Sequence, residues 1–269
     1  MTGLLIRGAL FLLTLTAATP PARRASLQVA VEDAADPWSR RDGTGYANDV
    51  VRAAFRAVDI DVTFLVVPYA RCKDMVVHAK VVACFSMSRA PDVEAAVAFP
   101  AMPLFVCEAA LLQSAAHPLP AATLDALPRG TVIGAVLGYE YPEAVERARA
   151  SGAITLENSP SEDLLLRKLA AGRLRGALVN VNESKPLAYL SAQARVADGI
   201  QRVGTVGRLD SYIGFSRRHP RGTWGLQQFE EGMRRITRSG ALASIAHVWA
   251  DSASARALAL RARPVGRSR

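Results

Sequence analysis

The chain has 269 residues, of which 50% are apolar and 21% are charged. This composition is typical of a packed globular protein of one or two domains and excludes an intrinsically disordered one. The formal net charge is +9, but residues 1–25 carry three arginines, residues 252–269 carry five, and neither segment has an acid. Residues 26–251 are therefore close to neutral. A nucleic-acid partner needs basic side chains gathered on one folded face, so we expect none.

The N-terminus has the pattern of a secretory signal peptide. Arg7 precedes an apolar run from Gly8 to Ala18, which at about 11 residues is shorter than the roughly 20 that a membrane-spanning helix needs. Small residues offer cleavage after Ala18 or after Ala25. We expect residues 1–25 to be a signal peptide and the mature protein to be soluble and periplasmic. The alternative is a buried N-terminal helix.

The first part of the mature chain alternates strands with helices. In chain order, we predict a strand at 27–31, a loop at 36–45, a helix from Asn48 or Asp49 to about Val58, a strand at 61–67, a helix at 69–78 and a strand at 81–85. Such alternation is typical of a parallel sheet covered by helices.

The middle of the chain repeats this theme, and the end is helical. Strands are predicted at 130–136, 153–156 and 177–181, helices at 142–150 and at about 161–171, and two further helices at about 224–238 and 240–250. Two α/β units and a helical end predict two lobes, with the chain crossing between them near 106–112 and 203–214. The predicted division is lobe 1 at 26–108, lobe 2 at 109–205, a return to lobe 1 at 206–251, and a basic tail outside the fold at 252–269.

The three cysteines fit an exported protein. Cys72, Cys84 and Cys107 form no CxxC pair and no metal-ligand cluster with histidine. In an oxidising compartment Cys72 and Cys84, which are close in sequence, are the pair that would form a disulfide. Three buried thiols are the alternative.

The order of segments resembles bacterial extracellular solute-binding proteins of family 3, the periplasmic receptors of amino-acid-type ABC transporters. Six segments in the family's order carry the resemblance, which covers roughly residues 27–250: DPWSRRDGTGYANDVVRAAF, VVPYARCKDMVVHAK, CFSMSRAPDVEAAVAFPAMPLF, RGTVIGAVLGYEYPEAVERA, the helix LAAGRL, and SGALASIAHVW. The resemblance implies a two-lobed α/β fold of the type II periplasmic-binding-protein kind. It also implies a ligand cleft between the lobes and a possible inner-membrane ABC permease as partner. We expect a monomer.

Two positions depart from the family's pattern for binding α-amino acids. The arginine that holds the ligand carboxylate in the family falls at Val93, and the aspartate that holds the ligand ammonium falls at Asn180. The resemblance thus predicts the fold, whereas the substitutions argue against an ordinary zwitterionic amino acid. An uncharged Asn180 fits a ligand that lacks a free α-amino group.

Candidate ligand contacts follow the predicted strand ends. Ser86 and Ser88 come directly after a buried strand, at the edge where open α/β sheets bind ligands. Arg89 or Arg71 could hold a carboxylate, which predicts a small polar, carboxylate-bearing ligand. The alternative for Arg89 is a surface loop position, and the partner of Arg71 could equally be an acidic side chain.

Aromatic and amide side chains complete the candidate site. Trp38, Tyr69 and Tyr139 occupy loop or helix-start positions, from which a ring could pack on a ligand. Asn180 interrupts an otherwise apolar strand and is the candidate contact from lobe 2. Ordinary packing is the alternative for each.

Enzyme motifs and metal-ligand spacings are missing from the sequence. There is no HExxH, GxSxG, P-loop or GxGxxG, and the four histidines are scattered. We therefore expect no catalytic residue, no metal and no cofactor. A sensor without a transporter is the alternative function, and a dehydratase-type enzyme using Glu32 or Glu140 as general acid is a third.

Export predicts a measurable change in the chain. Removal of 18–25 residues should be visible in the intact mass of the protein recovered from the periplasm. A full-length mass in that fraction would contradict the signal-peptide prediction.

Overall fold

A computed structural model describes residues 24–196 and 199–262, with side chains as far as Ser252. The elements in chain order are β1 Ala25–Glu32, β2 Ala34–Ala35, β3 Ser39–Arg40, α1 Tyr46–Arg56, β4 Ile60–Val67, α2 Tyr69–Val77, β5 Ala83–Met87, α3 Pro91–Glu94, β6 Val97–Ala98, β7 Phe105–Ser114, a 3-10 turn at Leu124–Ala126, β8 Thr131–Val136, α4 Glu143–Ala150, β9 Ile154–Ser159, α5 Glu162–Ala170, β10 Gly176–Val181, α6 Leu187–Ala194, β11 Ile200–Ser216, α7 Gly222–Arg238 and α8 Ala241–Ala262. Residues 1–23 of the predicted signal peptide lie outside the described residues, whereas Ala25, the last residue of the predicted segment 1–25, is the first residue of β1.

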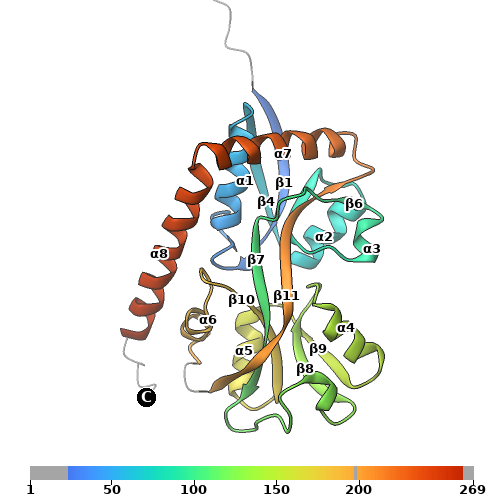
Figure 1. Cartoon of the computed structure of the whole chain (residues 1–269), viewed down its shortest axis with the longest axis vertical. Coiled ribbons are helices and arrows are strands. Elements are labelled where there is room, and N and C mark those ends of the chain that lie inside the picture. The colour runs from blue at the N-terminus through green and yellow to red at the C-terminus, as the bar shows by residue number, and fades with distance from the viewer. Residues whose placement is uncertain (1–23, 197–198, 263–269) are drawn as a thin grey trace, which may run out of the picture.

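The strands form two groups that share the long strands β7 and β11. Lobe 1 holds β4, β1 and β5 as parallel neighbours, and lobe 2 holds β10, β8 and β9, also parallel. β11 pairs antiparallel with β5 at its C-terminal end and with β7 along the rest of its length. Hydrogen bonding therefore follows one path through both lobes, β4-β1-β5-β11-β7-β10-β8-β9, although the parallel strands fall into two groups (Figure 1).

The crossings predicted near 106–112 and 203–214 are thus the two antiparallel strands β7 and β11. The structure gives each strand a larger extent than the predicted crossing, because each one enters the sheets of both lobes. The exact division of the chain between the lobes stays a prediction.

Each lobe has its own apolar core. In lobe 1, α1 and α7 pack on one sheet face through Phe55 and Phe229, whose ring centroids are 5.7 Å apart. A Cβ at Gly232 would lie 2.0 Å from the carbonyl oxygen of Ala54, so only glycine permits this close approach of the two helices. In lobe 2, α5 covers one face with Leu165, Leu166 and Leu169, and α4 covers the other.

Helix α1 begins differently from the prediction. Its N-cap is Gly45, with no side-chain cap, rather than Asn48 or Asp49. The Asn48 amide instead donates to the carbonyl of Gly43 at 3.0 Å. A Cβ at Gly45 would lie 2.3 Å from the carbonyl oxygen of Trp38, which fixes glycine at this turn and places Trp38 beneath the helix start.

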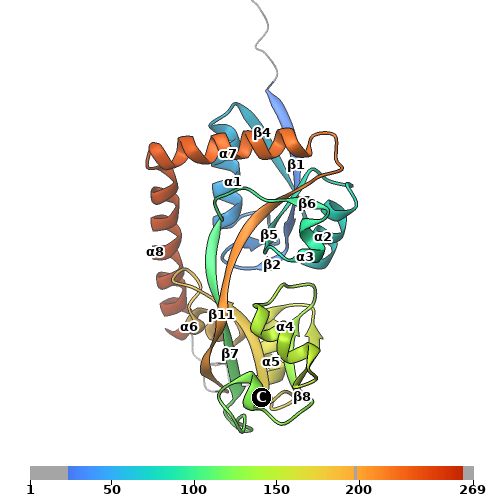
Figure 2. The same cartoon turned by 45° about the vertical axis from the view of Figure 1, so that its right-hand side comes forward.

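The C-terminal helix α8 turns away from α7 and runs beside lobe 2, next to α6 (Figures 1 and 2). The backbone continues as helix through Ala262, so the first part of the predicted tail extends α8. The side chains of residues 253–269 lie outside the described part of the chain, and the prediction that this tail is dispensable for folding stays open. None of the described helices is long and apolar enough to cross a membrane.

A disulfide joins Cys72 in α2 to Cys84 in β5, which confirms the pairing favoured from the sequence. Cys107 is a free, buried thiol. Both bridged residues are fully buried, so the bond fixes α2 against its strand. The start of α2 carries Tyr69 and thereby contributes to the site described below.

Loss of this disulfide should destabilise the protein. The C72A/C84A variant should lose about 2–4 kcal/mol of unfolding free energy, because the unfolded chain regains the entropy of an open loop. Urea unfolding with and without dithiothreitol measures this, and the reductant should weaken only the parent protein. Equal stability of the parent and the variant under oxidising conditions would contradict the prediction.

Candidate functional site

Four strands direct their carboxyl ends toward one cavity between the lobes. Strands β1 and β5 approach it from lobe 1, and β8 and β10 approach it from lobe 2, where such ends form the ligand edge of open α/β sheets. The cavity has a volume of about 20 Å³, room for roughly one water molecule. Its walls are Glu32, Trp38, Ser86, Ser88, Phe105, Tyr139, Glu140, Asn180 and Ser211.

Three polar side-chain atoms of this cavity wall are buried with neither a hydrogen-bond partner nor an ion-pair partner. They are Nε1 of Trp38, Oγ of Ser86 and Oδ1 of Asn180, and they come from a loop, from β5 and from β10. Buried polar atoms in proteins are normally paired. Three unpaired atoms around one cavity indicate a place where a ligand or water supplies the missing partners.

Ser86 also has an unusual backbone. Its φ is 67°, in the left-handed region that non-glycine residues seldom adopt. Such conformations cost about 1–3 kcal/mol and concentrate at functional sites. The conformation places an unpaired hydroxyl at the cavity wall, which supports a binding role for Ser86.

Aromatic rings form one side of the cavity. Trp38 stacks on Phe105 with ring centroids 4.3 Å apart. Phe105 belongs to β7, where it pairs with Ser211 of β11. The two strands that connect the lobes thus also supply two residues of the cavity wall.

A buried ion pair supports the lobe 2 side of the cavity. Lys185 is 0% exposed, and its ammonium donates to the carboxylate of Glu162, the first residue of α5. Glu162 Oε1 accepts from the backbone N–H of Asn180 at 3.2 Å. The Lys185 ammonium also lies 4.0 Å from the centre of the Trp38 ring. The pair therefore positions two residues of the cavity wall.

Hydrogen bonds and an ion pair join the lobes across the cavity. The hydroxyl of Tyr139 donates to Glu32 Oε1 at 2.6 Å, and the hydroxyl of Tyr69 donates to Glu140 Oε2 at 2.6 Å. The Lys73 ammonium lies 2.8 Å from Glu140 Oε1. Glu32, Tyr69 and Lys73 belong to lobe 1, whereas Tyr139 and Glu140 belong to lobe 2. The structure is therefore a closed arrangement of the lobes.

Burial changes the acidity of the groups in these contacts. Burial raises the pKa of Glu32 to about 8, and the hydrogen bond from Tyr139 and the charge of Lys185 offset only part of that effect. Burial is also the main cause that holds the pKa values of Tyr69 and Tyr139 well above their ordinary range, with nearby glutamates adding to it. Both tyrosines therefore remain hydrogen-bond donors throughout the physiological pH range.

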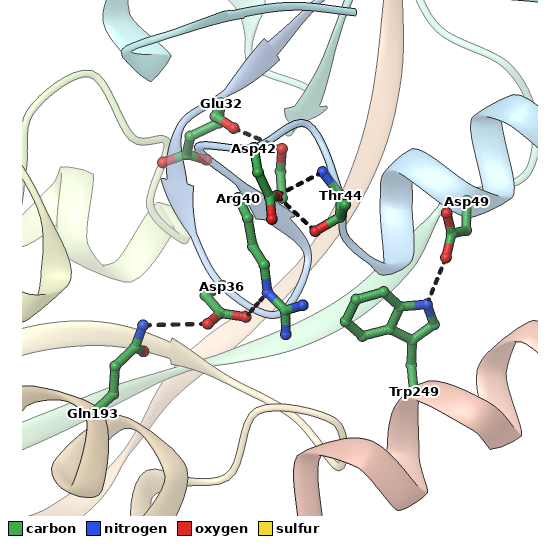
Figure 3. Close-up of polar contacts among 9 residues, drawn as sticks. Glu32, Asp36, Arg40, Asp42, Thr44, Asp49, Gln193 and Trp249 are labelled. Carbon is green, nitrogen blue, oxygen red and sulfur yellow. Dashed lines mark hydrogen bonds and ion pairs between the residues drawn. The ribbon is translucent and has the colours of Figure 1, made fainter. Parts of the chain in front are cut away.

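A second contact between the lobes lies at the rim. Asp36, in the loop between β1 and α1, accepts hydrogen bonds from Arg40 at 2.6 Å and from Gln193 of α6 at 3.4 Å (Figure 3). The Arg40 guanidinium lies 4.7 Å from the centre of the Trp249 ring, and the Trp249 indole donates to Asp49 of α1 at 2.9 Å. This loop thus links lobe 1, lobe 2 and α8.

The structure brings together most of the predicted contacts. Trp38, Ser86, Ser88, Tyr139 and Asn180 line the cavity. Tyr69 lies next to it and bonds Glu140. Whether any of these side chains contacts a ligand stays a prediction.

The two arginines expected to hold a carboxylate lie elsewhere. Arg71 is exposed. Arg89 is exposed too, pairs with Glu94 at 3.4 Å, and donates to the carbonyl of Pro100 at 3.0 Å. Its guanidinium also lies 5.0 Å from the centre of the Tyr212 ring. Ionic and cation–π contacts on the outside of lobe 1 therefore hold Arg89 away from the cavity.

Four other residues of the cavity wall were not predicted from the sequence as ligand contacts. Glu32 and Glu140 appeared only as possible acids of an enzyme, and the end of β1 before the loop at Asp36 was the signal that could have identified Glu32. Phe105 and Ser211 carried no signal, because their position depends on the pairing of β7 with β11.

The buried ion pair should be required for stability. Lys185→Met leaves the Glu162 carboxylate buried without its cation, and the unfolding free energy should fall by roughly 3–5 kcal/mol. Lys168→Met is the matched control, because its partner Glu157 is 45% exposed and such surface pairs contribute about 0–1 kcal/mol. Urea denaturation measures both changes, and equal losses in the two variants would contradict the prediction.

Neither a family model nor a curated protein matches the sequence. Solved structures do match the fold. A histidine kinase sensor domain with similarity to periplasmic binding proteins has a TM-score of 0.71 and 19% identity, over 84% of this chain and 96% of that one. An ancestral arginine-binding protein bound to arginine has a TM-score of 0.70 and 18% identity, over 84% and 98%. The substrate-binding protein of an amino acid ABC transporter has a TM-score of 0.65 and 13% identity, over 84% and 99%. The chain therefore has the two-lobed α/β fold of periplasmic binding proteins, as the resemblance to solute-binding protein family 3 implied.

Proposed function

We propose that the protein is a periplasmic solute-binding receptor that captures a small polar ligand between its lobes for an ABC transporter. The observation that carries this proposal is the cavity at the ends of β1, β5, β8 and β10, with unpaired polar atoms contributed by both lobes. A ligand there would contact both lobes at once and stabilise their closed arrangement. The similar substrate-binding protein of an amino acid ABC transporter supports the transport role.

A sensor role is the second candidate. It is supported by the similarity to a histidine kinase sensor domain. Both roles need the same ligand-dependent closure, so the cavity serves either. A dehydratase-type enzyme, the third possibility, is tested by a product assay on any ligand that binds.

Thermal unfolding of residues 26–269 with a broad panel of metabolites tests the receptor proposal. A ligand at 100 times its dissociation constant adds about 2.7 kcal/mol of stability. At this size that should raise the melting temperature by roughly 5–10 °C. Asn180→Ala should reduce the shift, whereas Asn158→Ala, at an exposed position of β9, should not. A panel without any stabilising compound would contradict the proposal.

Uptake separates transport from sensing. Cells that lack the protein should lose uptake of the radiolabelled ligand found in that panel, and the parent gene should restore it. Unchanged uptake together with a lost transcriptional response would support the sensor instead.

A further inference from the structure

Glu140 of lobe 2 places its carboxylate in a set of donors that belongs to lobe 1. The Tyr69 hydroxyl donates to Oε2 at 2.6 Å, the Lys73 ammonium lies 2.8 Å from Oε1, and the backbone N–H of Ser88 makes a long contact of 3.4 Å with Oε2. We call these three donors the lobe 1 anion site. A hydroxyl, an ammonium and an N–H at a strand end are the groups that would bind a carboxylate of a ligand. In the closed structure the protein's own Glu140 occupies that site.

Glu32 is the second carboxylate of the cavity wall. It is 3% exposed, and its Oε1 accepts from the Tyr139 hydroxyl at 2.6 Å. Among the described residues, no lysine, arginine or histidine forms an ion pair with it. Glu140 has Lys73 and Glu162 has Lys185, so Glu32 is the buried glutamate of this region whose charge has no cationic partner within ion-pair distance.

The rest of the cavity wall also favours a positive group. No lysine or arginine of the described chain lines the cavity. Unpaired acceptors are available at Ser86 Oγ and Asn180 Oδ1. The unpaired donor, Trp38 Nε1, would need an acceptor such as a ligand hydroxyl or a water. A volume of about 20 Å³ suits a group the size of a primary ammonium, so the remainder of a longer amine must lie outside this cavity.

We propose that the cleft binds a small amine without a carboxylate, with Glu32 as the partner of its cationic group and Glu140 filling the anion site that a ligand carboxylate would otherwise use. The proposal rests on the receptor function above and specifies its ligand class. The proposed ligand is cationic, whereas the sequence analysis predicted a carboxylate-bearing ligand. The two arginines on which that prediction depended, Arg71 and Arg89, lie outside the cavity. It also separates this chain from a receptor for zwitterions, which needs an open anion site.

Proton release should accompany binding. The pKa of Glu32 is about 8 because of burial. The charged and titratable groups that act on it are Tyr139 and Lys185, which lower its pKa, and Glu162 and Asp33, which raise it. A cation bound at neutral pH therefore displaces the proton of Glu32. Affinity should increase up to roughly tenfold per unit between about pH 6 and 8, and level off above, while the amine itself stays protonated.

Matched pairs of an amine and its parent amino acid test the ligand class. Calorimetry at pH 8 on residues 26–269 should compare agmatine with arginine, putrescine with ornithine, and histamine with histidine, with succinate as a pure dicarboxylate. At least one amine should bind tenfold or more tightly than its parent amino acid. Tighter binding of the amino acids or of succinate would overturn the proposal and leave the receptor function intact. Binding of other metabolites but of no amine would also overturn it, whereas a failure of every compound would contradict the receptor function itself.

Two substitutions test the assigned roles. Glu32→Gln keeps an acceptor for Tyr139 but removes the charge, so amine affinity should fall roughly 30-fold or more and lose its pH dependence. Glu140→Ala empties the lobe 1 anion site, so the preference for agmatine over arginine should shrink at least tenfold. Glu143→Ala, 83% exposed in α4, is the control and should change neither. Thermal unfolding establishes that each variant is folded. An unchanged pH profile in Glu32→Gln, or an unchanged preference in folded Glu140→Ala, would overturn the assignment.

Discussion

The antiparallel pairing of β7 with β11 is the interaction on which the rest of the structure depends. β7 pairs with β11 from Phe105 to Ser114, and the two strands belong to both lobes. At one end Phe105 and Cys107 join the apolar core of lobe 1, and further along Ala110 and Leu112 join that of lobe 2. Two continuous strands therefore hold two separately packed cores side by side. The register shifts of β11 near Gly204 and Gly207 locally interrupt the ladder between them.

Several charged side chains are buried around the cleft between the lobes, and specific ion-pair and hydrogen-bond partners compensate for their burial. Burying an ion costs several kcal/mol unless a partner and further hydrogen bonds compensate. Lys185 offsets Glu162, and Lys73 offsets Glu140. Glu32 instead has a tyrosine hydroxyl and a raised pKa. Two of the three buried glutamates therefore form ion pairs with a lysine, and Glu32 is the one that does not.

Fold and ligand have separate physical origins in this chain. Apolar periodicity, strand order and the close approach of α1 to Gly232 of α7 determine the two-lobed architecture. The proposed ligand site depends on a few side chains at strand ends, where Asn180 stands at the position of the aspartate that the family resemblance implies, and Arg89 is exposed. Solved proteins that share the fold at 13–19% identity are described as binding arginine, as transport components or as sensors. The fold is compatible with each of these roles, and the side chains of the cleft select among them.

The sequence by itself determined the elements that local physics controls. Short apolar runs predicted β1, β4, β8 and β10, and the segments between and after them predicted the helices α2, α5 and α7. The Ser161 hydroxyl caps α5 by accepting from the backbone N–H of Leu164. It also predicted the crossings and five of the residues that line the cavity, because residues at the ends of parallel strands share one edge.

Tertiary structure alone decided which side chains contact one another in and around the cleft. Arg89 lies against Tyr212 and Glu94, Glu140 reaches Tyr69 and Lys73 across the lobes, and Lys185 is buried beneath Trp38. Each of these contacts joins residues that only the packed fold brings into reach, so the sign of the charge in the cleft could not be read from residue types along the chain.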